Sequence, residues 1–373
     1  MMDATMMADR PVAEPIGFDA RAGDFVGLAI GNLLLTIITL GIYRFWAKTR
    51  VRRFLWERTT FMGEPLEYLG RGIEKFIGAL IVFFVLVVPI FLIAIAMVAL
   101  KAGGYSPATA GLLYLPFYIA LLWLFGVGIY RSQRYMFSRT SWRGIRGGMR
   151  HRGWAYGGLY LKMVLLQVVT LGFAIPYVTT RLWNARMSDA MFGSLPVTAD
   201  AEWRPLLRTF VTSWIGAIVI YAIMLGVALT SFGSLLGSIK PGAPPPADPG
   251  AMAADFAKFY AIFLVGGLAI ALVMFRYYAA MLRNLYGHTR LGTMALAIDV
   301  TAGDLLRFTL GNLALVVLTL GLGAIMLPYR VYGFYARRIS TIGALDIDAV
   351  RQTDLAAPVQ GDGLADAFDV GAF

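Results

Sequence analysis

The sequence predicts an all-α polytopic membrane protein, and two observations carry that prediction. Of the 373 residues, 58% are hydrophobic and 15% are charged, and the mean hydropathy is +0.68, whereas soluble globular domains contain about 25% charged residues. Apolar stretches of roughly 20 residues, the length that crosses a bilayer as a helix, recur along the chain. We expect about seven hydrophobic helical segments of this kind.

A Thr-Leu-Gly motif ends three of the apolar runs, and it defines three modules. The copies are Thr39-Leu40-Gly41, Thr170-Leu171-Gly172 and Thr319-Leu320-Gly321, and the modules are residues 23–68, 153–200 and 303–344. Glycine permits the chain to bend at each motif. Gly31-Asn32 and Gly311-Asn312 stand 280 residues apart, as the first and third motifs do. This agreement predicts an internal duplication.

Two transmembrane hairpins, residues 73–150 and 205–299, are predicted between the modules. Their apolar spans carry no charged residue through the middle, which is typical of lipid-facing helices. Gly153 and Gly157 have the spacing of a close helix-packing contact. Residues 1–22 are polar, and residues 345–373 are acidic and lack apolar periodicity, so we expect a disordered cytoplasmic tail there.

The positions of the basic residues favour one topology over another. If all seven segments cross the membrane, the basic loops 44–75 and 131–152 lie on one side of it, and residues 179–208 and 276–307 lie on the other. Because these last two segments are also basic, this topology breaks the positive-inside rule twice. If each module instead bends at its glycine and returns to the side of the membrane from which it entered, every arginine-rich segment is cytoplasmic. We favour this re-entrant arrangement, which also predicts that the modules pack centrally, because re-entrant backbone must be buried in protein.

Charge and residue usage exclude several classes of function. The net charge is +11, but the basic residues lie between apolar segments, where they set orientation and attract anionic lipid. We therefore expect no nucleic-acid partner, since that needs a basic face on a water-soluble domain. The chain has no cysteine and only two histidines, so no metal site or other cofactor is expected. No catalytic constellation is present, and we do not expect an enzyme.

Polar residues at predicted membrane depth form a candidate pocket. The six candidates are Asn32, Thr39, Lys162, Gln167, Asn312 and Thr319. One interpretation is structural, because Asn and Thr hydrogen-bond across packed helices and satisfy carbonyls near a glycine bend. The functional interpretation is a polar cavity between the first and third modules, with Asn32 and Asn312 in its wall.

Arginines of the basic segments are candidate contacts for anionic lipid headgroups. The candidates are Arg50, Arg53, Arg131, Arg134, Arg186 and Arg338. Their simplest role is to orient the chain in the membrane. A headgroup site is the functional alternative, because the guanidinium group donates two parallel hydrogen bonds to phosphate.

The first module resembles the YjgN family of bacterial inner-membrane proteins. The resemblance rests on the run from Asn32 to Tyr43, on Trp46-Ala47, on Arg53-Phe54-Leu55 and on Gly63, and it extends over most of residues 18–345. It implies a multi-pass protein of the bacterial cytoplasmic membrane whose family function is uncharacterised. The resemblance therefore supports the location and supplies no activity.

Two functions remain open from the sequence. The first is a transport or lipid-interacting protein whose modules enclose a polar pocket. The second is a non-catalytic membrane scaffold or assembly factor that binds partners or anionic lipid. Membrane lipids are the expected partners under both, and the sequence indicates neither a protein partner nor an oligomeric state.

Overall fold

The computed structural model describes residues 13–106, 112, 114–238, 249–345 and 350–355. The chain divides into two compact units. The first comprises Met1–Ala201, Leu285–Asp299 and Asn312–Phe373, and the second comprises Glu202–Asn284 and Val300–Gly311. All the strands belong to the first unit.

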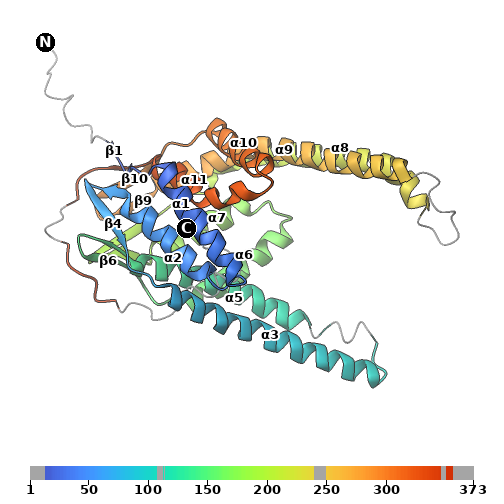
Figure 1. Cartoon of the computed structure of the whole chain (residues 1–373), viewed down its shortest axis with the longest axis horizontal. Helices are drawn as coiled ribbons and strands as arrows, with labels where there is room; N and C mark the ends of the chain where they lie inside the picture. Colours follow the sequence, from blue (N-terminus) through green and yellow to red (C-terminus); the bar gives the residue numbers. More distant parts are fainter. Residues whose placement is uncertain (1–12, 107–111, 113, 239–248, 346–349, 356–373) are drawn as a thin grey trace, which may run out of the picture. The chain divides into compact units, whose positions relative to one another are not determined.

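The described chain is mostly helical. In the order of Figure 1, the α-helices are α1 (Ala22–Ile38), α2 (Arg44–Glu57), α3 (Gly72–Ala102), α5 (Tyr114–Arg139), α6 (Gly153–Val169), α7 (Ile175–Met187), α8 (Leu207–Ser238), α9 (Pro249–Gly287), α10 (Ala302–Leu318) and α11 (Leu327–Ala336). Two 3₁₀ helices, η2 (Arg204–Leu206) and η3 (Leu322–Met326), precede α8 and α11.

The predicted fold class is confirmed only in part, because the mostly helical chain also contains an antiparallel sheet. Its strands are β1 (Ala13–Pro15), β2 (Gly17–Phe18), β3 (Thr59–Phe61), β4 (Glu64–Tyr68), β5 (Thr140–Trp142), β6 (Ile145–Met149), β7 (Ala190–Phe192), β8 (Leu195–Ala199), β9 (Thr289–Leu291), β10 (Met294–Ile298) and β11 (Ile339–Ile342). The strand order is β1-β11-β10-β9-β8-β7-β6-β5-β4-β3-β2. Only Ile16 separates β1 from β2, so the pairings return to the N-terminal strand where they began.

Tight turns with glycine build the β-hairpins. Met62 and Gly63 have φ angles of 49° and 81°, and Arg143 and Gly144 have φ angles of 51° and 74°. Positive φ at both central residues is the conformation that matches the twist of a two-residue hairpin. Gly193 and Gly292 have positive φ at the first loop residue of their hairpins, the position that takes glycine in a type II′ turn. Gly63 and Gly193, which follow the first and second Thr-Leu-Gly motifs in the sequence, therefore lie in hairpin turns of the sheet.

Pairs of helices leave this sheet and return to it. Between β2 and β3 the chain forms α1 and α2, between β4 and β5 it forms α3 and α5, and between β6 and β7 it forms α6 and α7. The chain between β8 and β9 forms α8 and α9, and the chain between β10 and β11 forms α10 and α11. In Figure 1 the strands gather together while α3 extends away from them.

The Thr-Leu-Gly motifs form the same bend in each module. Leu40 has a φ of 51° and Gly41 a φ of 91°, and the second and third motifs repeat these values within a few degrees. A leucine in this left-handed region costs about 1–2 kcal/mol. The helix before the bend and the helix after it contact one another in the first and second modules. The bends are thus observed, while the duplication that would explain them stays a prediction.

Four helices of the described chain are long and apolar enough to cross a membrane. They are Gly72–Ala102, Tyr114–Arg139, Arg204–Leu229 and Phe256–Gly287. The first helix of each module has 17 residues, or about 25 Å at 1.5 Å per residue, which is shorter than a hydrocarbon core of about 30 Å. The described structure therefore does not support seven full spans.

An aromatic core packs the first module against the third. Phe25 is fully buried, and its ring centroid lies 5.4 Å from that of Phe54 and 5.3 Å from that of Tyr329. The Tyr332 hydroxyl hydrogen-bonds Thr59 at 2.8 Å. Burial raises the pKa of Tyr332 to about 12.

The second unit is held by contacts between its own helices. The Phe210 and Tyr277 rings meet edge to face at 5.0 Å, and the Ser213 hydroxyl donates to the Val273 carbonyl at 3.0 Å. At the start of α10 the Asp304 carboxylate accepts the Thr301 backbone N–H at 3.0 Å, and the Thr301 hydroxyl accepts the Asp304 N–H at 3.1 Å. This reciprocal pair caps the helix.

Residues 350–355, which the sequence placed in the acidic tail, contact two β-hairpins. They contain no helix or strand, but the Gln352 side chain accepts the Arg146 N–H at 3.1 Å and donates to the Gly144 carbonyl at 3.0 Å. The Ser194 N–H donates to the Arg351 carbonyl at 2.9 Å. The predicted disorder of residues 346–349 and 356–373 lies outside the described residues.

Candidate functional site

A cavity of about 600 Å³ lies between the first and third modules, and we call it the inter-module cavity. Its walls come from α1, α2, η3 and α11. Its apolar lining is Ala29, Leu33, Ala47, Val51, Leu55, Ala324, Ile325, Leu327, Pro328 and Val331. Its polar lining is Asn32, Thr36, Arg44, Lys48 and Arg52. The cavity therefore combines a mostly apolar wall with three cations.

The cations come from one face of α2. Arg44, Lys48 and Arg52 are spaced four residues apart, which places them on one helical face. Arg52 is 3% exposed, and its guanidinium donates to the Tyr68 hydroxyl at 3.3 Å and lies 5.9 Å from the centre of the Tyr68 ring. None of the residues that line the cavity is acidic. The lining thus favours an anion with an apolar body.

Asn32 joins the two helices of the first module. It is 5% exposed, and its side-chain oxygen accepts a hydrogen bond from the Arg50 guanidinium at 3.3 Å. Asn312 accepts a hydrogen bond from the Arg330 guanidinium in the third module. The two modules therefore form the same Asn–Arg pair. Only Asn32 lines the inter-module cavity.

The other predicted pocket residues do not line the inter-module cavity. The Thr39 hydroxyl donates to the Leu35 carbonyl at 2.7 Å and accepts the Tyr43 N–H at 2.9 Å, so it caps the bend. Thr319 makes the corresponding bonds to Leu315 and Gly323. Lys162 is exposed on α6 and Gln167 is half-buried on the same helix. The structure thus brings one of the six candidates into this cavity.

The predicted lipid-contact arginines are distributed over several elements. Arg50 and Arg53 are exposed on α2. Arg131 lies 4.8 Å from the centre of the Trp154 ring, and Arg186 lies 6.0 Å from that of Tyr156. Arg134 donates to the Met149 carbonyl at 3.2 Å, and Arg338 donates to the Phe334 carbonyl at 3.1 Å. They do not converge on one site, and no observation tests their contact with lipid.

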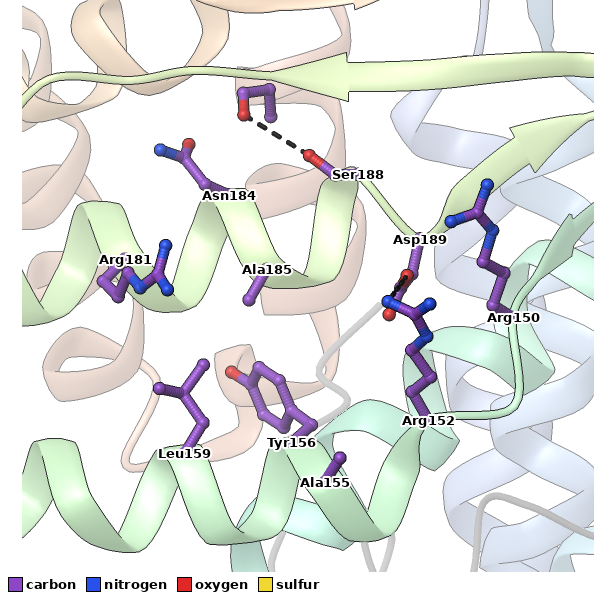
Figure 2. A pocket seen from close by; sticks show the side chains of 11 residues that line it. Arg150, Arg152, Ala155, Tyr156, Leu159, Arg181, Asn184, Ala185, Ser188 and Asp189 are labelled. Atoms are coloured by element: carbon purple, nitrogen blue, oxygen red, sulfur yellow. Dashed lines mark hydrogen bonds and ion pairs between the residues drawn. The ribbon is translucent and has the colours of Figure 1, made fainter.

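A second cavity, of about 470 Å³, lies in the second module, and we call it the arginine pocket. Its lining is Arg150, Arg152, Ala155, Tyr156, Leu159, Arg181, Asn184, Ala185, Ser188, Asp189 and Ala199. Figure 2 shows Tyr156 and Leu159 on α6 directed toward α7, which carries Arg181, while Arg150 and Arg152 lie beside Asp189. The sequence does not predict this pocket.

The single carboxylate of the arginine pocket is held by neighbouring groups. The Tyr130 hydroxyl donates to Asp189 Oδ2 at 2.9 Å, and Asp189 Oδ1 lies 3.7 Å from Arg152 Nη1. The Asn184 side chain bonds both the N–H and the carbonyl of Ala201, at 3.0 Å and 2.9 Å. These contacts hold the end of α7 against the adjacent backbone. Within the described residues there is no group of three or more His, Cys, Asp or Glu side chains suited to a metal ion.

Comparison with known proteins places the chain in a family. Residues 13–367 match the family model described as "Bacterial protein of unknown function (DUF898)". The chain belongs to this DUF898 family. The inner membrane protein YjgN of Salmonella typhimurium strain LT2 is 24% identical over 393 residues, covering 93% of this chain and 92% of that relative.

Two further DUF898-like relatives match part of the chain. The inner membrane proteins YjgN of Escherichia coli O157:H7 and of strain K12 are 26% and 27% identical over 172 residues, which cover 46% of this chain and 40% of each relative. No solved structure matches. The resemblance to the YjgN family is thereby confirmed, and this DUF898 protein is an inner-membrane protein of a family whose function is unknown.

Proposed function

We propose that this DUF898 protein binds an anionic amphiphile, such as an anionic membrane lipid, in the inter-module cavity. The observation that carries the proposal is the pairing of an apolar wall with Arg44, Lys48 and Arg52 and with no acid in the lining. An acyl chain matches the wall, and a charged headgroup matches the cations, each of which contributes about 1 kcal/mol near an anionic group. The proposed role is binding, with no catalytic step.

The continuous sheet supports a single-sided arrangement of the connecting segments. The pairs β4–β5, β6–β7 and β8–β9 link successive hairpins by backbone hydrogen bonds. The strands are two to five residues long, whereas a strand that crosses a bilayer needs about 9–11 residues. The hairpin segments of the sheet then all lie on the same side of the membrane. The arginine-rich segments at the sheet favour the cytoplasmic side.

The exposed bends support insertion of the three modules into the bilayer. Leu40, Leu171 and Leu320 are 94%, 78% and 95% exposed at the tips of their modules. Such side chains gain about 25 cal/mol per Å² when they leave water, and hydrocarbon supplies that environment. Arg44 and Lys48 lie in the first two turns of α2, directly after the first tip. Cations near the membrane surface attract anionic lipid headgroups, which supports a headgroup in the inter-module cavity.

Neutralising two of the cavity cations should weaken anionic lipid binding by roughly 30-fold, since two cations at about 1 kcal/mol each give about 2 kcal/mol. The variant is Arg44→Gln with Lys48→Gln, and native mass spectrometry of the purified protein measures bound phosphatidylglycerol against phosphatidylcholine. Arg71→Gln is the control, because Arg71 is exposed and lies outside the cavity. Equal lipid occupancy in all three proteins would refute lipid binding here and favour the scaffold function.

A further inference from the structure

The arginine pocket carries more positive charge than its own carboxylate balances. Its lining contains three arginines and one acid, and Asp189 is already engaged by Arg152 and by the Tyr130 hydroxyl. Within the part of the chain that the structure describes, the Arg150 and Arg181 guanidinium groups form no ion pair. Two cations are therefore available to an anion that enters the pocket.

Arg181 has the same position in its module as Arg50 and Arg330, but it lacks their asparagine partner. Arg50, Arg181 and Arg330 each stand eleven residues after the threonine of their motif, counted from Thr39, Thr170 and Thr319. Arg50 and Arg330 bond to Asn32 and Asn312, which stand seven residues before those threonines. The second module has Met163 at that position. No amide partner exists there, and the Arg181 guanidinium lines the arginine pocket instead.

Helical spacing places polar groups along the length of the pocket. Arg181 and Asn184 on α7 and Ser188, the residue that follows its last turn, are three and four residues apart, and they line one side. Asn184 and Ser188 are held by bonds to the Ala201 and Ala199 backbone, so that side is ordered before any ligand binds. Figure 2 shows Arg150 and Arg152 at the Asp189 end and Arg181 further along α7.

We propose that the arginine pocket is a second binding site that takes a phosphate-bearing ligand, with Arg150 at the Asp189 end and Arg181 further along α7 as its cationic contacts. Guanidinium groups donate in a planar fork that matches phosphate oxygens, and the pocket supplies cations from two elements. The phosphate group belongs either to a small phosphorylated solute or to a lipid headgroup, because the same chemistry recognises both. This site shares no residue with the inter-module cavity, so it stands independently of the lipid-binding proposal.

The test uses the purified full chain in a zwitterionic detergent and titrates three probes: inorganic phosphate, glycerol 3-phosphate and phosphatidic acid in mixed micelles. We expect at least one probe to bind. Arg181→Gln and Arg150→Gln should each lower the affinity for that probe by roughly tenfold or more. Arg290→Gln, an exposed arginine of β9 outside the pocket, is the control. Both substituted pocket arginines are exposed, and an unchanged gel-filtration profile shows that the variants remain folded.

The three probes separate the two sources of phosphate. Binding of glycerol 3-phosphate or inorganic phosphate that both pocket variants lose indicates a soluble ligand, and binding of phosphatidic acid alone with the same loss indicates a headgroup. If no probe binds, or if both pocket variants bind as the control does, the proposal is overturned. The Arg44→Gln, Lys48→Gln variant should retain this binding, which distinguishes the two sites.

Discussion

Replacing Gly157 by valine should destabilise the packing of α5 against α6 by about 3 kcal/mol, the upper end of the range for overpacked sites. A Cβ atom at Gly157 would lie 2.5 Å from Val127 Cγ2 and 2.8 Å from the Trp123 carbonyl oxygen. The second of these is backbone, which cannot rotate away. Thermal unfolding of the purified protein measures the effect as a lower melting temperature.

Gly158→Val is the matched control for this prediction. Gly158 is the next residue of the same helix, and a Cβ atom there would meet nothing within 4 Å. Both variants replace glycine by valine in the same helix, so the change in intrinsic helix propensity is the same for both. It therefore cancels when their melting temperatures are compared. Equal melting temperatures for the two variants would show that α5 and α6 do not approach one another as closely as described.

Phe25→Ala should lower the free energy of unfolding by about 3–5 kcal/mol, the usual loss when a buried phenylalanine is truncated. Phe25 is fully buried and touches the rings of both Phe54 and Tyr329. The substitution therefore opens a void at the contact between the first and third modules. Chemical unfolding in detergent, followed by tryptophan fluorescence, measures the loss.

Leu34→Ala provides the comparison on the same helix. Leu34 is 54% exposed, so its truncation should change the unfolding free energy by less than about 1 kcal/mol. If Phe25→Ala lowered the free energy of unfolding no more than Leu34→Ala does, the first and third modules would not share a packed core. The inter-module cavity would then not exist as described.

The helices and bends follow from local sequence, while the sheet depends on distant pairing. Long apolar runs predicted the hairpin helices, and glycine predicted the bends at Gly41 and its counterparts. The strands are two to five residues long, too short to show a periodic pattern, and β1 pairs with β11 from the far end of the chain. Gly63 and Gly193 were visible in the sequence, but only the paired strands reveal them as hairpin turns.

The candidate site was predictable only in part from the polarity of single residues. Asn32 was identified from its polarity at membrane depth, and it lines a cavity between the first and third modules. Thr39 has the same polarity but satisfies backbone groups at its bend. Arg150 and Arg152 were interpreted only as orientation signals, because the sequence does not show that they line the same pocket as Arg181.

Single-cysteine labelling tests most directly the proposal that the hairpin segments of the sheet all lie on one side of the membrane. The chain has no native cysteine, so Glu64→Cys, His151→Cys, Ser194→Cys and Thr293→Cys each introduce one thiol at an exposed position of a connecting segment. We predict that a membrane-impermeant maleimide labels all four in inside-out vesicles and none in right-side-out vesicles. Labelling of Ser194→Cys and Thr293→Cys from the face opposite to Glu64→Cys and His151→Cys would contradict the account.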